Sequence, residues 1–185
     1  MNLEKMFQMQ AELDRRIIRE KGLEGQDLLP GLILALQVEL AECANEWRGF
    51  KFWSNDQQPR TCIINKEGET SRDYYKNPLL EEYVDCLHFI LSIGNHIMYP
   101  SNYNMDILKR AIFYDGGVNA FSAVFYEVSS FYVELETGGE VSSSFVEIFM
   151  RFNALGIALG FTPEEIEDAY IKKNAVNHKR QQEGY

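Results

Sequence analysis

Carboxylates recur at helical spacing in two apolar segments of the chain. Glu39, Glu42 and Glu46 are separated by three and four residues, and Glu82 and Asp85 are separated by three. Side chains three or four residues apart share one face of an α-helix. Clustered like charges repel one another, and burying them without a partner costs several kcal/mol. A divalent cation would relieve both costs, and ligands that are all oxygen favour Mg²⁺ first and Mn²⁺ second.

Solvent exposure and other kinds of metal site fit these carboxylates less well. Most carboxylates on helices face solvent, but two acidic pairs on two apolar helices make exposure less favourable. A di-iron or di-manganese bundle requires Glu-x-x-His pairs on two helices, and Asp85-x-x-His88 is the nearest approach. None of the three histidines follows a Glu by three residues: His88, His96 and His178. A thiolate zinc site is disfavoured because no close pair exists among the cysteines, Cys43, Cys62 and Cys86.

Polar residues also interrupt the apolar pattern near both ends of the chain. Gln10 and Asp14 are four residues apart in an apolar helical segment. A buried Gln needs hydrogen-bond partners, which either a nucleobase edge or a neighbouring helix would supply. Lys173, Asn177 and Arg180 share one helical face. Their cations suit phosphate contact, although a helix C-terminus also favours basic residues.

A third group of polar and aromatic residues follows the first carboxylate segment. The stretch from Trp47 to Trp53 alternates cations, including Lys51, with aromatic rings. These rings would stack on a base or pack on the core.

Hydrophobic spacing predicts helices almost throughout, and these would position the polar residues. The expected helices cover about 2–21, 30–52, 78–98, 118–137 and 142–159, with a short one within 104–113. A last helix begins after Thr162, where Pro163 and a capping-box Glu165 follow the N-cap. The polar stretch 54–77 is the longest loop, and no run of alternating strands is present. We therefore expect one all-α domain over residues 1–185.

Composition limits the function classes. The 185 residues include 18 Lys and Arg against 28 Asp and Glu, which gives a formal net charge of −10. This acidity argues against nucleic-acid binding, and it disfavours a phosphate ligand unless a divalent metal reverses the local sign. The N-terminus lacks a signal-peptide pattern, and the run 28–36 is too short to span a membrane. Unpaired cysteines favour a reducing compartment, so we expect a cytoplasmic protein without a membrane partner.

Four segments resemble the dimeric, all-α dUTPases, a branch of the all-α nucleotide pyrophosphatase superfamily that includes the MazG proteins. Met9–Asp14 is the first segment, and Glu39-x-x-Glu42 with Asn45–Trp47 and Lys51–Trp53 is the second. The third is Glu82-x-x-Asp85-x-x-His88. The fourth is Tyr170-x-x-Lys173-Asn174-x-x-Asn177-x-x-Arg180-Gln181-x-x-Gly184-Tyr185. The acidic pairs are shared across the superfamily, whereas the C-terminal string is more specific to the dUTPase branch.

The resemblance implies a bundle of about six helices with a four-helix core, and a homodimer. It implies hydrolysis of dUTP, and of dUDP, to dUMP with release of pyrophosphate or phosphate. Mg²⁺, with Mn²⁺ as a substitute, would be held by Glu39, Glu42, Glu82 and Asp85. The uracil side would be lined by Gln10, Trp47 and His88, with Asp14 also on the substrate side. Asn177 would contact the deoxyribose, and the phosphates would meet Lys51, Lys173 and Arg180.

In this scheme Glu39, with Glu42 as the alternative, takes the proton from the attacking water. The sequence does not distinguish attack at the α-phosphorus from attack at the β-phosphorus. Two other functions stay open. One is a house-cleaning pyrophosphatase that prefers dCTP or modified nucleotides. The other is a metal-binding or protein-binding bundle without turnover, although a full set of carboxylates and C-terminal cations argues against it.

Overall fold

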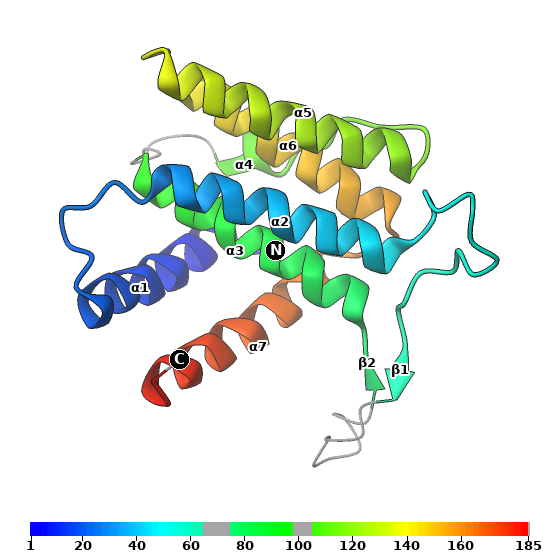
Figure 1. Ribbon diagram of the computed structural model, residues 1–185, viewed down its shortest axis with the longest axis horizontal. Coiled ribbons are helices and arrows are strands. Elements are labelled where there is room, and N and C mark those ends of the chain that lie inside the picture. Colours follow the sequence, from blue (N-terminus) through cyan, green and yellow to red (C-terminus); the bar gives the residue numbers. More distant parts are fainter. Residues whose placement is uncertain (65–74, 98–104, 185) are drawn as a thin grey trace.

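The computed structural model describes residues 1–64, 75–97 and 105–184. In these ranges the chain forms seven helices and one small sheet (Figure 1). The helices are α1 (Leu3–Lys21), α2 (Leu29–Trp47), α3 (Pro78–His96), α4 (Met105–Leu108), α5 (Gly117–Glu136), α6 (Ser142–Ala158) and α7 (Pro163–Gln182). The strands are β1 (Ile63–Ile64) and β2 (Tyr75–Lys76). The expected all-α fold is therefore confirmed.

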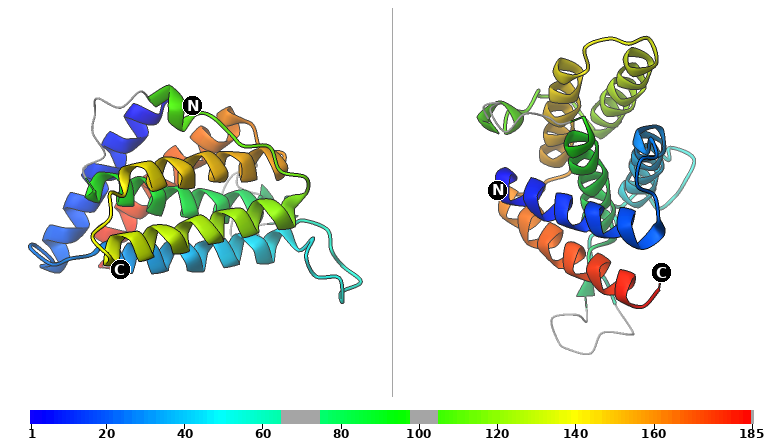
Figure 2. Two further views of the ribbon diagram at one scale, coloured as in Figure 1. Left: turned by 90° about the horizontal axis from the view of Figure 1, so that it is seen from above. Right: turned by 90° about the vertical axis from the view of Figure 1, so that its left-hand side faces the viewer.

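Four long helices form the core of the molecule. α2 packs on α3, α5 packs on α6, and these two antiparallel pairs meet through α2 with α5 and α3 with α6. α1 and α7 contact each other, and both cross α3 on its other side (Figures 1 and 2). The central helix α3 is consequently the most buried, with apolar side chains on several faces. Because other helices pack against several sides of α3, polar side chains on this helix lie in an enclosed environment.

Local signals explain where the main helices begin and end. α1 starts after Asn2, whose side chain accepts from the Lys5 N–H, and ends at Gly22 in the left-handed conformation. α7 has the expected capping box between Thr162 and Glu165. The helix predicted over 30–52 ends earlier, at Trp47. Arg48 adopts a φ of 65°, and its N–H closes the last turn on the Ala44 carbonyl.

Two further differences from the sequence-based expectation are small. Ile63 and Ile64 pair with Lys76 and Tyr75 as an antiparallel ladder, where no strand was expected. β-branched Ile favours this extended conformation. The short helix expected within 104–113 covers only Met105–Leu108. Residues 65–74 of the polar loop, and Met98 at the expected end of α3, lie outside the described residues.

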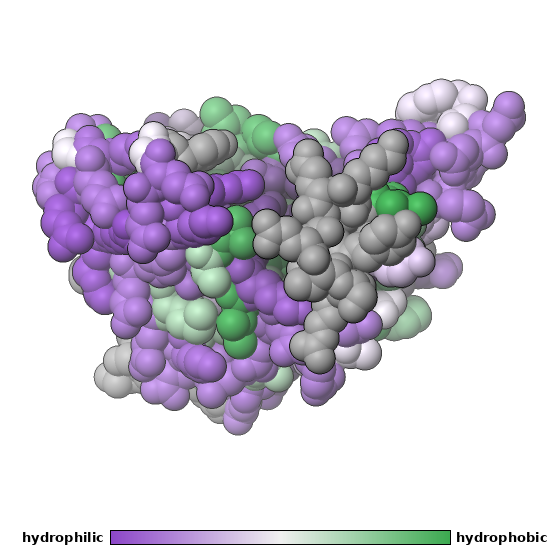
Figure 3. All heavy atoms as spheres, turned by 90° about the horizontal axis from the view of Figure 1, so that it is seen from below, coloured by the Kyte–Doolittle hydropathy of each residue, from purple (hydrophilic) through white to green (hydrophobic). Residues whose placement is uncertain are grey.

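The surface and the helix lengths bear on what the molecule can contact. The underside of the molecule is mainly hydrophilic, with a narrow band of hydrophobic residues exposed in its middle (Figure 3). In the described part of the chain no single helix is long and apolar enough to cross a membrane, while the bent pair α6–α7 meets that test by length and composition alone.

Candidate active site

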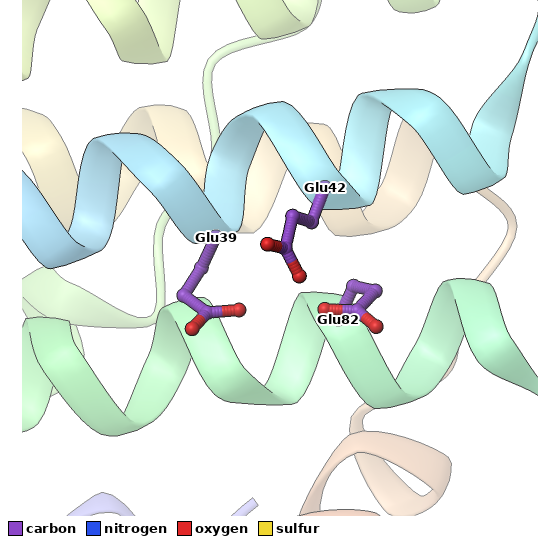
Figure 4. A group of neighbouring side chains, drawn as sticks. All are labelled: Glu39, Glu42 and Glu82. Atoms are coloured by element: carbon purple, nitrogen blue, oxygen red, sulfur yellow. The ribbon is translucent and has the colours of Figure 1, made fainter.

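Three glutamates meet at the seam between α2 and α3. Carboxylate oxygens of Glu39, Glu42 and Glu82 all lie within 4.8 Å of one another. Figure 4 shows the first two side chains reaching from α2 and Glu82 reaching from α3 into the same space. Buried Cys43 of α2 lies beside them, with its Sγ 4.0 Å from the Leu79 carbonyl of α3. Packing of the apolar faces therefore brings like charges together at the edge of the seam.

The cluster is electrostatically strained. Partial burial is the main cause that raises the pKa of Glu82 to about 7, and the charges of Asp85, Glu39 and Glu42 add to it. Burial and the charges of Asp85 and Glu42 also raise the pKa of Glu39. Lys173 opposes both shifts. Converging oxygen ligands in a negative field match the preference of a hard divalent cation, so these residues fit Mg²⁺ or Mn²⁺.

Two carboxylates from the same sequence pattern lie outside this cluster. Asp85 Oδ2 accepts from Lys173 Nζ at 2.5 Å, which links α3 to α7. Glu46 continues the face of Glu39 and Glu42 in sequence, but it pairs with Arg60 at 3.0 Å. The predicted role of Asp85 as a fourth metal ligand stays a prediction.

A cavity of about 620 Å³ opens beside the acidic cluster, between α1, α2, α3 and α7. Much of its wall is apolar, with Leu13, Ile17 and Phe89 among the lining residues. Most of the site residues predicted from the sequence line it: Gln10, Asp14, Glu39, Asp85, His88, Lys173, Asn177 and Arg180. Carboxylates, cations and apolar side chains thus line one pocket, a combination that suits a nucleotide.

Gln10 is at the centre of a hydrogen-bond network in the pocket wall. Its Nε2 donates to Asp14 Oδ1 at 2.8 Å and to Ser92 Oγ at 3.0 Å. Its Oε1 accepts from the Tyr170 hydroxyl at 3.0 Å and faces His88 Nδ1 at 2.6 Å. All the hydrogen-bonding capacity of the amide is used within the protein. Of the two partners considered from the sequence, a nucleobase edge or a neighbouring helix, Gln10 bonds to neighbouring helices. It orients the side chains of Asp14 and His88.

The network determines the state of His88. Asp14 only accepts, so Gln10 turns its amide nitrogen to Asp14 and its oxygen to His88. His88 Nδ1 consequently carries the proton, and Nε2 is a hydrogen-bond acceptor. Burial, and secondarily the charge of Lys173, lowers the pKa of His88 to about 3. Nε2 is buried and has no hydrogen-bond partner among the described residues, while the ring stacks on Tyr170 at 4.4 Å.

Sequence reasoning missed two members of this network. Ser92 is a small polar residue in a long apolar stretch of α3, and it donates to Asp14 Oδ1 at 2.9 Å. Tyr170 is fully buried and also bonds the Met6 carbonyl at 3.1 Å. The sequence feature that could have identified Ser92 is a single polar residue inside an apolar helical stretch.

Two predicted substrate contacts lie elsewhere in this chain. The Trp47 ring packs on Phe121 at the α2–α5 contact, with a centroid separation of 5.5 Å. Gly49 and Gly117 lie against the same ring, where a Cβ atom would collide with it. Lys51 Nζ lies over the Phe50 ring at 5.6 Å. Neither Trp47 nor Lys51 lines the cavity. Their substrate roles stay predictions.

Comparison with known proteins agrees with this geometry. A family model described as dUTPase matches residues 2–70 and 69–185, which is nearly the entire chain. A search of curated proteins found no match. The match includes the acidic α2–α3 seam and the basic face of α7, and the fold is all-α as this family requires. The chain therefore belongs to the all-α dUTPase family.

Proposed function

We propose that this dUTP diphosphatase holds Mg²⁺, or Mn²⁺ in its place, at Glu39, Glu42 and Glu82, and that it converts both dUTP and dUDP to dUMP. The family supports dUTP hydrolysis in general. The metal assignment rests on one observation, the convergence of three carboxylates within 4.8 Å. A bound divalent cation would offset charge on the phosphates and on the leaving group.

Glu39 is the best candidate for the proton acceptor. It borders the cavity and is half-buried, whereas Glu42 is exposed and does not line the cavity. Glu39 would thus accept the proton of the attacking water, with Glu42 as the alternative.

The basic face of α7 would receive the rest of the nucleotide. Lys173, Asn177 and Arg180 follow one another at four and three residues and line the same cavity. Their order along α7 leads from the acidic cluster toward the C-terminal end of the helix. Lys173 and Arg180 would bind phosphate oxygens, and Asn177 would bind the deoxyribose.

Selection of the base would depend on His88. Its neutral ring offers Nε2 as an acceptor, and uracil carries a hydrogen on N3 that this atom can accept. Cytosine has an unprotonated N3, so two acceptors would face each other without a hydrogen between them. Leaving a buried acceptor unpaired costs about 1–3 kcal/mol. This argues for uracil and against the alternative substrate dCTP.

A panel of nucleotides assayed with Mg²⁺ tests the substrate. We expect dUMP and pyrophosphate from dUTP, dUMP and phosphate from dUDP, and at least about tenfold lower kcat/KM for dCTP. Equal activity on every base would contradict the assignment of His88 and favour a house-cleaning pyrophosphatase.

We further propose that the active form is a homodimer joined at the α2–α5 seam. Gln37 Nε2 donates to Ser129 Oγ across this seam. Apolar side chains flank it on the surface, with Leu34 62% and Tyr126 69% exposed. Val38 and Val133 are exposed on the same two helices. Apolar surface of this kind is commonly covered by a second subunit.

Light scattering on purified protein tests the dimer. Leu34→Asp should shift the mass toward that of one chain. Ile157→Asp is the matched control, because Ile157 is equally exposed but lies on α6. A wild-type protein of single-chain mass would contradict the proposal, as would equal loss of the dimer in both variants.

A further inference from the structure

Lys173 is held by the acidic cluster that it borders. Its Nζ lies 2.5 Å from Asp85 Oδ2, and the two side chains are only 22% and 18% exposed. Asp85 is one helical step from Glu82, and its charge acts on both Glu82 and Glu39. The ammonium of Lys173 therefore neutralises part of the same negative field that would attract a divalent cation.

A divalent cation and Lys173 are competitors in this arrangement. Both are positive, and both are stabilised by the carboxylates of the α2–α3 seam. Their mutual repulsion at short range is strong, because the effective dielectric constant of a half-buried site is about 20, against about 80 in water. Asp85 is also unable to give its full charge to a metal while it accepts from Lys173.

The Lys173 side chain has a second position available, in the substrate cavity. It lines the substrate cavity together with Asn177 and Arg180. A lysine ammonium sits on a flexible four-carbon stem, so it can change partners without movement of the backbone. α7 itself is fastened independently, by the stacking of Tyr170 on His88 and by the hydrogen bond from Tyr170 to Met6. The helix can keep its position while the Lys173 side chain swings.

We propose that Lys173 takes the place of a divalent cation beside Asp85 until the cation binds, and that it then moves to a phosphate of the substrate. This inference rests on the metal site proposed above. The exchange couples the two ligands: the cation releases Lys173 for the phosphate, and the phosphate stabilises Lys173 away from Asp85. By linkage, each ligand raises the affinity for the other. The enzyme would thus favour the metal and the nucleotide together over either one alone.

Calorimetric titration of Mn²⁺ into the full-length protein, without nucleotide, tests this inference. Lys173→Met removes the competing charge, so the affinity for Mn²⁺ should rise at least about tenfold over the wild type. Lys172→Met is the matched control, because Lys172 carries the same charge one residue away on the exposed side of α7. Solvent and salt screen that charge, so this variant should stay within about twofold of the wild type.

Lys173→Gln provides a second variant that can still donate to Asp85 but carries no charge. It should also bind Mn²⁺ more tightly, and circular dichroism will show whether both variants keep the helical fold. Unchanged or weaker Mn²⁺ binding in folded Lys173 variants would overturn the inference and leave the metal site standing. An equal gain in Lys172→Met would overturn it as well. Absence of Mn²⁺ binding in the wild type and in every variant would overturn the proposed metal site together with the inference.

Discussion

Two helix pairs in the same four-helix core carry clustered glutamates. In one pair the glutamates have cation and hydroxyl partners, and in the other they face one another. Between α5 and α6, Arg151 pairs with Glu127 at 2.9 Å and reaches Glu147 at 3.5 Å. In the same region Glu134 accepts from the hydroxyl of Ser144. Between α2 and α3, the three glutamates face one another. Among the described residues, the cation that opposes the raised pKa values of Glu39 and Glu82 is Lys173, which comes from α7.

The difference separates a structural cluster from a binding cluster. A buried carboxylate is stable when a cation or hydroxyl from the same packing unit satisfies it. The α5–α6 pair supplies those partners from its own two helices. In the α2–α3 pair the corresponding partners are absent among the described residues, and a cavity opens beside the charges instead. Uncompensated charge next to a cavity is the arrangement that a cation-dependent active site needs.

Replacement of the proposed base should have the largest effect. Glu39→Gln keeps the shape of the side chain but cannot accept a proton, so kcat for dUTP should fall about 10²–10⁴-fold. The midpoint temperature of thermal unfolding should not fall, because the substitution keeps the side-chain shape and removes one repelling charge. Steady-state kinetics and calorimetry measure both quantities. Glu147→Gln on α6 is the control, with kcat expected within about twofold of the wild type. Similar losses of kcat in the two variants would contradict the assignment of the α2–α3 glutamates to catalysis and the α5–α6 glutamates to structure.

Loss of the internal cation should affect stability and not chemistry. Arg151→Met leaves Glu127, which is nearly buried, without its ion pair. We expect the free energy of unfolding in urea to fall by about 2 kcal/mol. Lys109→Met is the comparison, because it breaks an exposed pair with Asp106, which solvent screens, and it should cost clearly less than Arg151→Met. An Arg151→Met protein as stable as the Lys109 variant would show that the α5–α6 cluster does not need its arginine.

The smallest expected effect is a pH dependence of stability that comes from Glu82. Its pKa is about 7 in the fold, against an ordinary value of 4.5, so the native state binds this proton more tightly than the unfolded state. In protein without added metal, the contribution of Glu82 to stability should therefore fall as pH rises from about 4.5 to 7, while the low pKa of His88 makes its own contribution rise up to about pH 6.5. After allowance for solvent screening of a half-exposed group, the loss is about 1 kcal/mol.

Denaturation in urea at several pH values measures this loss. The contribution of His88 is common to the wild type and Glu82→Gln, so the wild type should lose about 1 kcal/mol relative to this variant between pH 4.5 and 7. Added Mg²⁺ should stabilise the wild type most at the upper end of that range. Parallel profiles for Glu82→Gln and the wild type across this window would contradict the raised pKa assigned to Glu82.

The sequence predicted the helices and the acidic segments because both depend on local spacing. Three-residue and four-residue intervals place Glu39 beside Glu42 whatever the rest of the fold does. Contacts between distant segments were harder to anticipate. The spacing of Lys173 gave no sign that it would pair with Asp85, and the Gln10 pattern did not show that the amide would be fully used inside the protein. Trp47 packs on Phe121 of α5, a contact between distant segments that hydrophobic periodicity does not encode.

The dependence of dUTP hydrolysis on Mg²⁺ concentration tests the central claim most directly. The protein is first freed of metal with EDTA, and the initial rate of dUMP formation is then followed as Mg²⁺ is added. We expect no turnover in EDTA, a saturable rise for the wild type, a superimposable curve for Glu147→Gln, and a curve shifted at least about tenfold to higher Mg²⁺ for Glu42→Gln. Turnover in EDTA, or identical curves for Glu42→Gln and the wild type, would contradict a divalent cation site at the α2–α3 seam.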